Sequence, residues 1–319
     1  MAVSTQKRIE ELDFLKCIFI LLMIAFHLVY FGDKYPYAKD WVYTFHIPAF
    51  LLISGYLMHV EKHVWAFLRS MLWIFIPYTI MEVGYVVMSS VLPVRGGADH
   101  ITWQLLLEKV FVSPMGPYWY LHTLLVCGLS YFAIDRLLGG LIKTFPLLVT
   151  LSLAFVGLSY GLSLVSPSSA FYFMIGIIVK QTNVGFAAFF RKSWWSIMPL
   201  FLLSVYPENL ERFSIPGILI TYLVISLLLA MYSILPGFIQ QFGCYIGRNT
   251  LLLLLFSPIF TMLVKPLANV LSFDASGMTF LLVSLSITVA GSFLLTWSMD
   301  RLGLSPYFFG KEKALTPYR

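Results

Sequence analysis

The feature that most constrains this chain is a series of apolar stretches, each of about 17 to 25 residues, separated by short polar connections. A helix of that length crosses the hydrocarbon layer of a bilayer. Hydrophobic residues make up 59% of the 319 residues and charged residues only 11%, which is more apolar surface than a soluble domain of this size could cover. The sequence therefore predicts an all-α polytopic membrane protein.

The apolar stretches predict about ten transmembrane helices in one bundle. No long linker or low-complexity tract interrupts them, so we expect a single domain over residues 1–319. The expected spans are 14–32, 43–60, 69–92, 117–134, 145–164, 168–182, 193–207, 214–234, 249–269 and 278–298.

The distribution of cations predicts the orientation of these spans. Leaving Lys16 aside, fourteen Lys and Arg residues fall in the two tails and in the connections on their side of the membrane, and six fall on the other side. Short cytoplasmic connections carry the excess of cations, so both termini should be cytoplasmic. The net charge of +6 then reflects a positive inner face toward membrane lipids and requires no nucleic-acid partner.

The three cysteines do not indicate a metal site. Cys17, Cys127 and Cys244 lie in or beside different spans, and their spacing is not that of zinc ligands. Free cysteine commonly packs as a small apolar residue. We therefore expect no bound metal.

The stretch "KCIFILLMIAFH" places a cation and an imidazole on one helix. Eleven residues of α-helix turn through about 1100°, so Lys16 and His27 share one face and lie about 16 Å apart along the axis. Asp13 precedes Lys16 by three residues, close enough for an ion pair. Lys16 would stay near the cytoplasmic side while His27 faces a buried space deeper in the membrane.

A second histidine, His46, lies near the start of the next span, which begins "WVYTFHIPAFLLISGYL". The two spans form an antiparallel hairpin, which places His27 and His46 at a similar depth. Ionisable groups inside a membrane are functional by default. The alternatives are that each histidine only bonds a neighbouring helix and that Lys16 only reaches the inner headgroups.

Further along the chain, Glu82 lies within the third span, where a carboxylate is costly unless it meets a cation or lines a cavity. Trp119 suits the outer interfacial belt, and stacking on a sugar is the alternative. Lys62 and Arg248 belong to the cytoplasmic face, where most cations serve only as topology signals.

Four segments together resemble the acyltransferase 3 family of integral-membrane acyltransferases. Lys16 and His27 fit the family's pattern of Arg or Lys, ten residues, then His. "FHIPAFLLISGYL", which contains His46, is similar to its second-helix pattern. "FLRSMLWIFIPY" and "GPYWYLHTLL" resemble its third-helix and Trp-aromatic-Leu segments. The chain departs from the pattern at Leu72, where some members carry a second Arg, and at Ser257, where the family often has His.

The resemblance implies an enzyme that transfers an acyl group, usually acetyl from acetyl-CoA, to a hydroxyl of a glycan or lipid-linked sugar. His27 would be the base that accepts the hydroxyl proton, or a transient acyl carrier, and His46 would orient it or hold the acceptor. Lys16 and Arg69 would bind the phosphates of the donor. We expect a further set of residues to contact substrate or line the cavity: Asp13, Tyr78, Glu82, Trp119 and Tyr120.

Two other classes of function stay open at this point. Ten spans with buried polar groups also suit an exporter or transporter of polysaccharide or small solutes. A third class is an assembly partner in an envelope-polysaccharide complex, as a homo-oligomer or with other proteins. All three classes place the chain in a bacterial inner membrane.

Overall fold

The computed structural model describes residues 9–91, 100–182 and 184–318, and within those ranges the regular structure is entirely helical. Short helical turns at Gly116–Tyr118, Gly157–Gly161, Trp194–Ser196 and Pro207–Leu210 complete several of the helices. The α-helices are α1 (Glu10–His27), α2 (Val29–Lys34), α3 (Pro36–Leu57), α4 (Val64–Ser89), α5 (Trp103–Phe111), α6 (Trp119–Leu138), α7 (Thr144–Val156), α8 (Pro167–Gln181), α9 (Phe186–Phe189), α10 (Ile197–Ser204), α11 (Ile215–Tyr232), α12 (Gly237–Arg248), α13 (Thr250–Leu263), α14 (Leu267–Val270), α15 (Met278–Arg301) and α16 (Ser305–Phe309).

Within the described ranges, five helical segments are long and apolar enough to cross a membrane. They are α4, α6 with its preceding turn, α7 with its following turn, α11 and α15; the pair α12 and α13, bent by 76°, makes a sixth if it forms one span. The chain is thus a multi-pass membrane protein. The number of ten spans and the cytoplasmic position of both termini remain predictions.

Two helices that were expected to be spans, α1 and α8, fall outside this set because of their charge or their length. The 18 residues of α1 include Glu10, Glu11, Asp13 and Lys16, and α8 is only 15 residues long. Both helices pack against several other helices of the protein. Length and composition by themselves therefore do not decide whether they span the bilayer.

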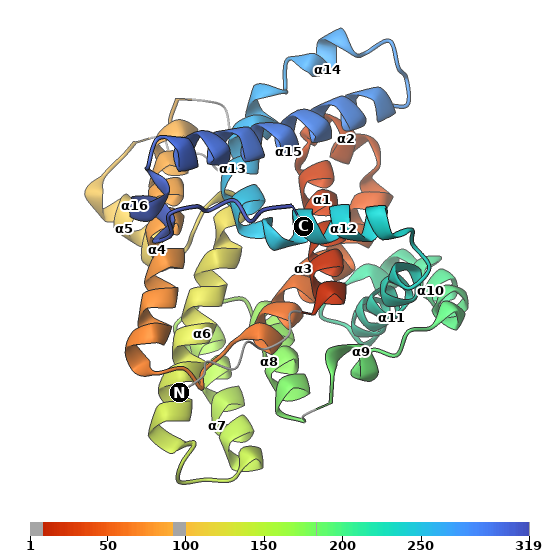
Figure 1. Ribbon diagram of the computed structural model, residues 1–319. Coiled ribbons are helices and arrows are strands. Elements are labelled where there is room, and N and C mark those ends of the chain that lie inside the picture. Colours follow the sequence, from red (N-terminus) through yellow and green to blue (C-terminus); the bar gives the residue numbers. More distant parts are fainter. Residues whose placement is uncertain (1–8, 92–99, 183, 319) are drawn as a thin grey trace.

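The two helices that carry the histidines lie at the centre of the bundle (Figure 1). Helix α1 packs against α3, α11, α12, α13 and α15, and α3 packs against α8, α11 and α6. In Figure 1, α4 and α6 lie on one side of this central pair, and α10 and α11 lie on the other. Most residues of α1 between Leu12 and Phe26 are accordingly buried.

Two glycines allow α3 and α8 to cross in close contact. A Cβ atom built on Gly55 would lie 2.1 Å from the carbonyl oxygen of Phe173, and one built on Gly176 would lie 2.1 Å from that of Leu52. Real Cβ atoms do not approach backbone oxygen so closely. Small residues at such crossings let membrane helices pack backbone to backbone.

We therefore expect Gly176→Ala to destabilise the bundle by about 1 to 3 kcal/mol, the usual cost of overpacking a rigid contact. Gly84→Ala in α4 is the matched control, because a Cβ there meets no atom within 4 Å. Thermal unfolding of the two variants in detergent measures the difference. Equal melting temperatures for both would show that α3 and α8 separate at little cost.

The predicted orientation has a direct test. Single cysteines at Lys62 and Lys143 should react with an impermeant maleimide only after the cells are opened, and a cysteine at Asp40 should react in intact cells. All three positions are exposed, and the native Cys17, Cys127 and Cys244 are buried, so the background is low. The opposite pattern of labelling would place the termini outside.

A cavity along α1 and α3 as the candidate active site

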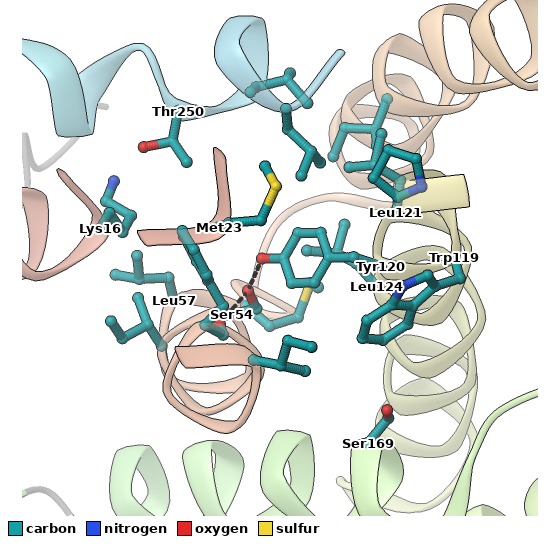
Figure 2. Close-up of a pocket in the computed structure, with 18 of the residues that line it drawn as sticks. Lys16, Met23, Ser54, Leu57, Trp119, Tyr120, Leu121, Leu124, Ser169 and Thr250 are labelled. Carbon is teal, nitrogen blue, oxygen red and sulfur yellow. Dashed lines mark hydrogen bonds between the residues drawn. The ribbon is translucent and has the colours of Figure 1, made fainter. Parts of the chain in front are cut away.

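A cavity of about 710 Å³ runs along α1 and α3 and is closed by residues of α4, α6, α8, α12 and α13. It is lined by Lys16 near the start of α1 and by His27 at the end of the same helix. Figure 2 shows Lys16 and Thr250 on one side of this space and Trp119, Leu121 and Leu124 on the other. The predicted shared face of Lys16 and His27 is thus the face that α1 turns toward the cavity.

One end of the cavity, which we call the histidine end, is formed by His27, His46 and Arg212. The ring of Tyr43 lies between the two imidazoles, with its centroid 6.1 Å from that of His27 and 5.0 Å from that of His46. The hairpin that α1 and α3 form through α2 therefore brings both histidines to the same aromatic side chain. His46 is fully buried, whereas His27 is accessible from the cavity.

The two histidines hold the same tautomer. Nδ1 of His27 lies 2.7 Å from the carbonyl oxygen of Met23, and Nδ1 of His46 lies 2.7 Å from that of Val42. A carbonyl oxygen only accepts, so in each neutral ring the proton is on Nδ1 and the lone pair is on Nε2. Nε2 of His46 is buried and has no hydrogen-bond partner among the described residues. Each ring can therefore accept a proton at Nε2.

The opposite end, which we call the lysine end, gathers cations from two distant parts of the chain. Lys16 of α1 and Arg248 of α12 line it, and Lys62 lines the same cavity. Asp13 is buried beside these cations. Its Oδ1 lies 2.7 Å from Nζ of Lys16, and its Oδ2 lies 3.6 Å from Nε of Arg248. The Asp13 carboxylate thus positions two cations, and Nη2 of Arg248 also lies 3.9 Å from Oε1 of Glu10.

Close helix packing places Arg248 in this cluster. A Cβ on Gly247 would lie 1.7 Å from the carbonyl oxygen of Asp13, so only glycine allows α12 to approach α1 here. The next residue, Asn249, forms the junction with α13, and its Oδ1 accepts a hydrogen bond of 2.9 Å from the backbone N–H of Thr316. The C-terminal tail therefore holds the bend that carries Arg248.

Between its ends the cavity is lined mainly by apolar side chains, together with a hydroxyl pair. The hydroxyl oxygens of Ser54 in α3 and Tyr120 in α6 are 2.6 Å apart, and the two side chains face each other in Figure 2. The Ser54 hydroxyl donates to the carbonyl oxygen of Phe50 at 2.8 Å, so Tyr120 must be the donor of the pair. Phe50 and Leu124 are among the apolar side chains around it. The cavity thus has charged or titratable side chains at its two ends and the Ser54–Tyr120 hydroxyl pair between them.

Several residues named from the sequence lie elsewhere. Arg69 is exposed on α4, one residue before the cavity-lining Ser70. The Tyr78 hydroxyl donates to the carbonyl oxygen of Val110 at 2.7 Å and so holds the end of α5. Buried Glu82 accepts a 2.5 Å hydrogen bond from the backbone N–H of Met115, just before α6. Of the residues expected to contact substrate, Trp119 and Tyr120 line the cavity, and Asp13 contributes through its ion pairs.

Among the polar and charged residues that line the cavity, Tyr43 and Arg212 were not singled out from the sequence. Tyr43 looks like one more aromatic residue at a membrane boundary, and Arg212 lies in a short connection before α11 where a cation carries no motif. Arg248 was read only as a topology signal. Each of them reaches the cavity through a contact with a distant part of the chain, which no local pattern displays.

Comparison with known proteins identifies the family. Residues 9–297 match the model of a family described as an acyltransferase domain, the acyltransferase 3 family. No curated protein and no solved structure matches the chain. The match covers most of the 319 residues and includes α1, α3 and every cavity residue named above. The chain therefore belongs to the acyltransferase 3 family and is a membrane acyltransferase.

Proposed function

We propose that this acyltransferase moves an acetyl group from acetyl-CoA to a hydroxyl of a glycan or lipid-linked sugar in the bacterial inner membrane. The observation that carries the proposal is the single cavity that Lys16 and His27 both line, from the two ends of α1. A donor with a charged head and a long, thin arm suits this shape. Its phosphates would bind at the lysine end and its thioester would reach the histidine end.

The chemistry follows from the free Nε2 atoms. The acceptor oxygen attacks the thioester carbonyl carbon while Nε2 of His27 takes the hydroxyl proton. The tetrahedral intermediate then collapses, the carbon–sulfur bond breaks, and the imidazolium returns the proton to the departing CoA sulfur. Atoms and charges balance without a metal or a further reactant. In this scheme His46, which lines the cavity beside the same tyrosine ring, orients the acceptor.

Donor binding would depend mainly on Lys16 and Arg248, which Asp13 holds together. Lys62 lines the same cavity. Arg69 lies on the outside of α4 next to Ser70, so it would act at the mouth of the cavity rather than inside it. Cytoplasmic acetyl-CoA reaches these cations under the predicted orientation.

Purified protein with radiolabelled acetyl-CoA and envelope glycans tests the proposal. We expect labelled ester on the glycan and release of CoA in equal amounts. The same cavity would also suit a solute pathway, and a transporter would instead show counterflow in vesicles without acetyl transfer. Mass spectrometry of envelope glycans from cells with and without the gene identifies the acceptor.

A further inference from the structure

The histidine end contains a cation that the proposed chemistry does not use. Arg212 lines the cavity there, between the turn Pro207–Leu210 and α11. The hydroxyl of Tyr172 donates to its carbonyl oxygen at 2.5 Å, and Thr44, two residues before His46, donates to the nearby Leu210 carbonyl at 2.7 Å. Its backbone is therefore fixed to α8, and the turn that precedes it to α3, next to the histidines.

The guanidinium of Arg212 differs in its partners from two of the other cavity cations. Lys16 and Arg248 are both paired with Asp13. In the ranges that the structure describes, no carboxylate lies within ion-pair distance of Arg212. An arginine at the wall of a protein cavity gains most from a planar or tetrahedral anion that it can bind through two N–H groups.

The charge of the whole cavity lining also favours an anionic ligand. Its described lining residues include the cations Lys16, Lys62, Arg212 and Arg248, and none of those lining residues is Asp or Glu. Donor phosphates would neutralise the two cations at the lysine end, Lys16 and Arg248. They do not account for Arg212, because Arg212 lies with His46 at the histidine end of the cavity. Lys16 lies near the opposite end of α1.

We propose that the acceptor carries an anionic group, a sugar carboxylate or a phosphate ester, which binds Arg212 while a neighbouring hydroxyl reaches His27. This inference rests on the proposed acetyl transfer and names its acceptor class. A neutral sugar would leave the guanidinium without a counter-charge in a confined space, whereas an acidic sugar supplies one. Arg212 is thus a specificity residue.

The first measurement is acetyl transfer to whole envelope glycans, which tests the proposed function alone. The second compares matched acceptors or inhibitors of that transfer: methyl glycosiduronates against their uronamides, and methyl glycoside 6-phosphates against their 6-O-methyl ethers, in gluco, galacto and manno forms. We expect the acid of at least one pair to be used or to inhibit about tenfold better, the worth of a hydrogen bond to a charged group. The pair with the larger ratio shows whether the anion is carboxylate or phosphate.

Variants separate recognition of charge from other roles. Arg212→Gln should reduce the acid-to-neutral ratio to about 1, Arg212→Lys should keep part of it, and Lys265→Gln, an exposed cation outside the cavity, should keep all of it. Transfer to envelope glycans with no preference for acids in any pair would overturn the inference and leave the proposed function standing. An equal loss for acid and neutral acceptors in Arg212→Gln would overturn it too, since Arg212 would then act on the reacting group or the fold. No transfer to any glycan would overturn both.

Discussion

Replacing His27 by alanine is expected to lower the rate of acetyl transfer by about 10² to 10⁴, the usual worth of a positioned general base. The variant loses the Nε2 lone pair that faces the cavity from the end of α1. It should still fold, because the only hydrogen bond that the imidazole makes in the described structure is to Met23 on its own helix. Donor binding, measured by titration with acetyl-CoA, should persist.

Two other histidines make this result interpretable. His122→Ala is the matched control, because His122 bonds the carbonyl oxygen of Phe111 and does not line the cavity. It should retain nearly full activity. His46→Ala should cost less than His27→Ala if it only orients the acceptor, and an equal loss would make it a second base. Full transfer activity in a correctly inserted His27→Ala protein would exclude His27 as the base.

The pH dependence gives an independent check on the same assignment. Only a neutral imidazole accepts a proton, so the rate of the wild-type enzyme should rise with pH as the catalytic ring loses its charge. The residual rate of His27→Ala should lack this rise. A variant that keeps the wild-type profile at a lower rate would show that another group is the base.

The α-helical period was enough to predict the cavity face of α1. Lys16 and His27 are eleven residues apart, and an uninterrupted helix from Glu10 to His27 must place both on one side. The antiparallel hairpin also predicted that His46 lies near His27, since two adjacent antiparallel helices pair their residues in order, and both rings contact Tyr43. These features depend only on local geometry, which the sequence determines directly.

The ends and bends of the helices were not predictable in the same way. The apolar run to residue 32 hides the break at Leu28, where the backbone leaves the helical conformation with no proline or glycine to mark it. The expected span at residues 249–269 begins at the bend of 76° after α12. That bend depends on Gly247 lying against Asp13 and on Asn249 bonding Thr316, both contacts between distant segments.

Charge pairing was predictable only within a helix. The spacing of three residues gave the ion pair of Asp13 with Lys16, which the structure confirms at 2.7 Å. The second partner of Asp13, Arg248, lies more than 200 residues away in the sequence, and Arg212 reaches the histidine end through tertiary packing alone. Sequence patterns therefore predicted the helix faces but not the cations that reach them from distant segments of the chain.

The second large effect is expected at the lysine end. Lys16→Ala and Arg248→Ala should each raise the KM for acetyl-CoA by about 10- to 100-fold, because each removes a charge-assisted hydrogen bond to a phosphate. Lys16→Arg should retain much of the affinity, since charge and reach are similar. Lys192→Ala is the matched control: Lys192 pairs with Glu11 near the start of the same helix but does not line the cavity.

The comparison with Arg69→Ala decides where the donor enters. Arg69 is exposed on α4, so its loss should weaken the donor less than the loss of Lys16 or Arg248 if the phosphates lie inside the cavity. A larger effect at Arg69 would move the phosphates to the outside of α4. Asp13→Asn should separate binding from positioning, because it keeps the charges of both cations but removes the carboxylate that holds their side chains in position. Unchanged donor affinity in both Lys16→Ala and Arg248→Ala would remove the lysine end from the donor site, because two cations on one buried carboxylate could not both be irrelevant to a polyanion bound beside them.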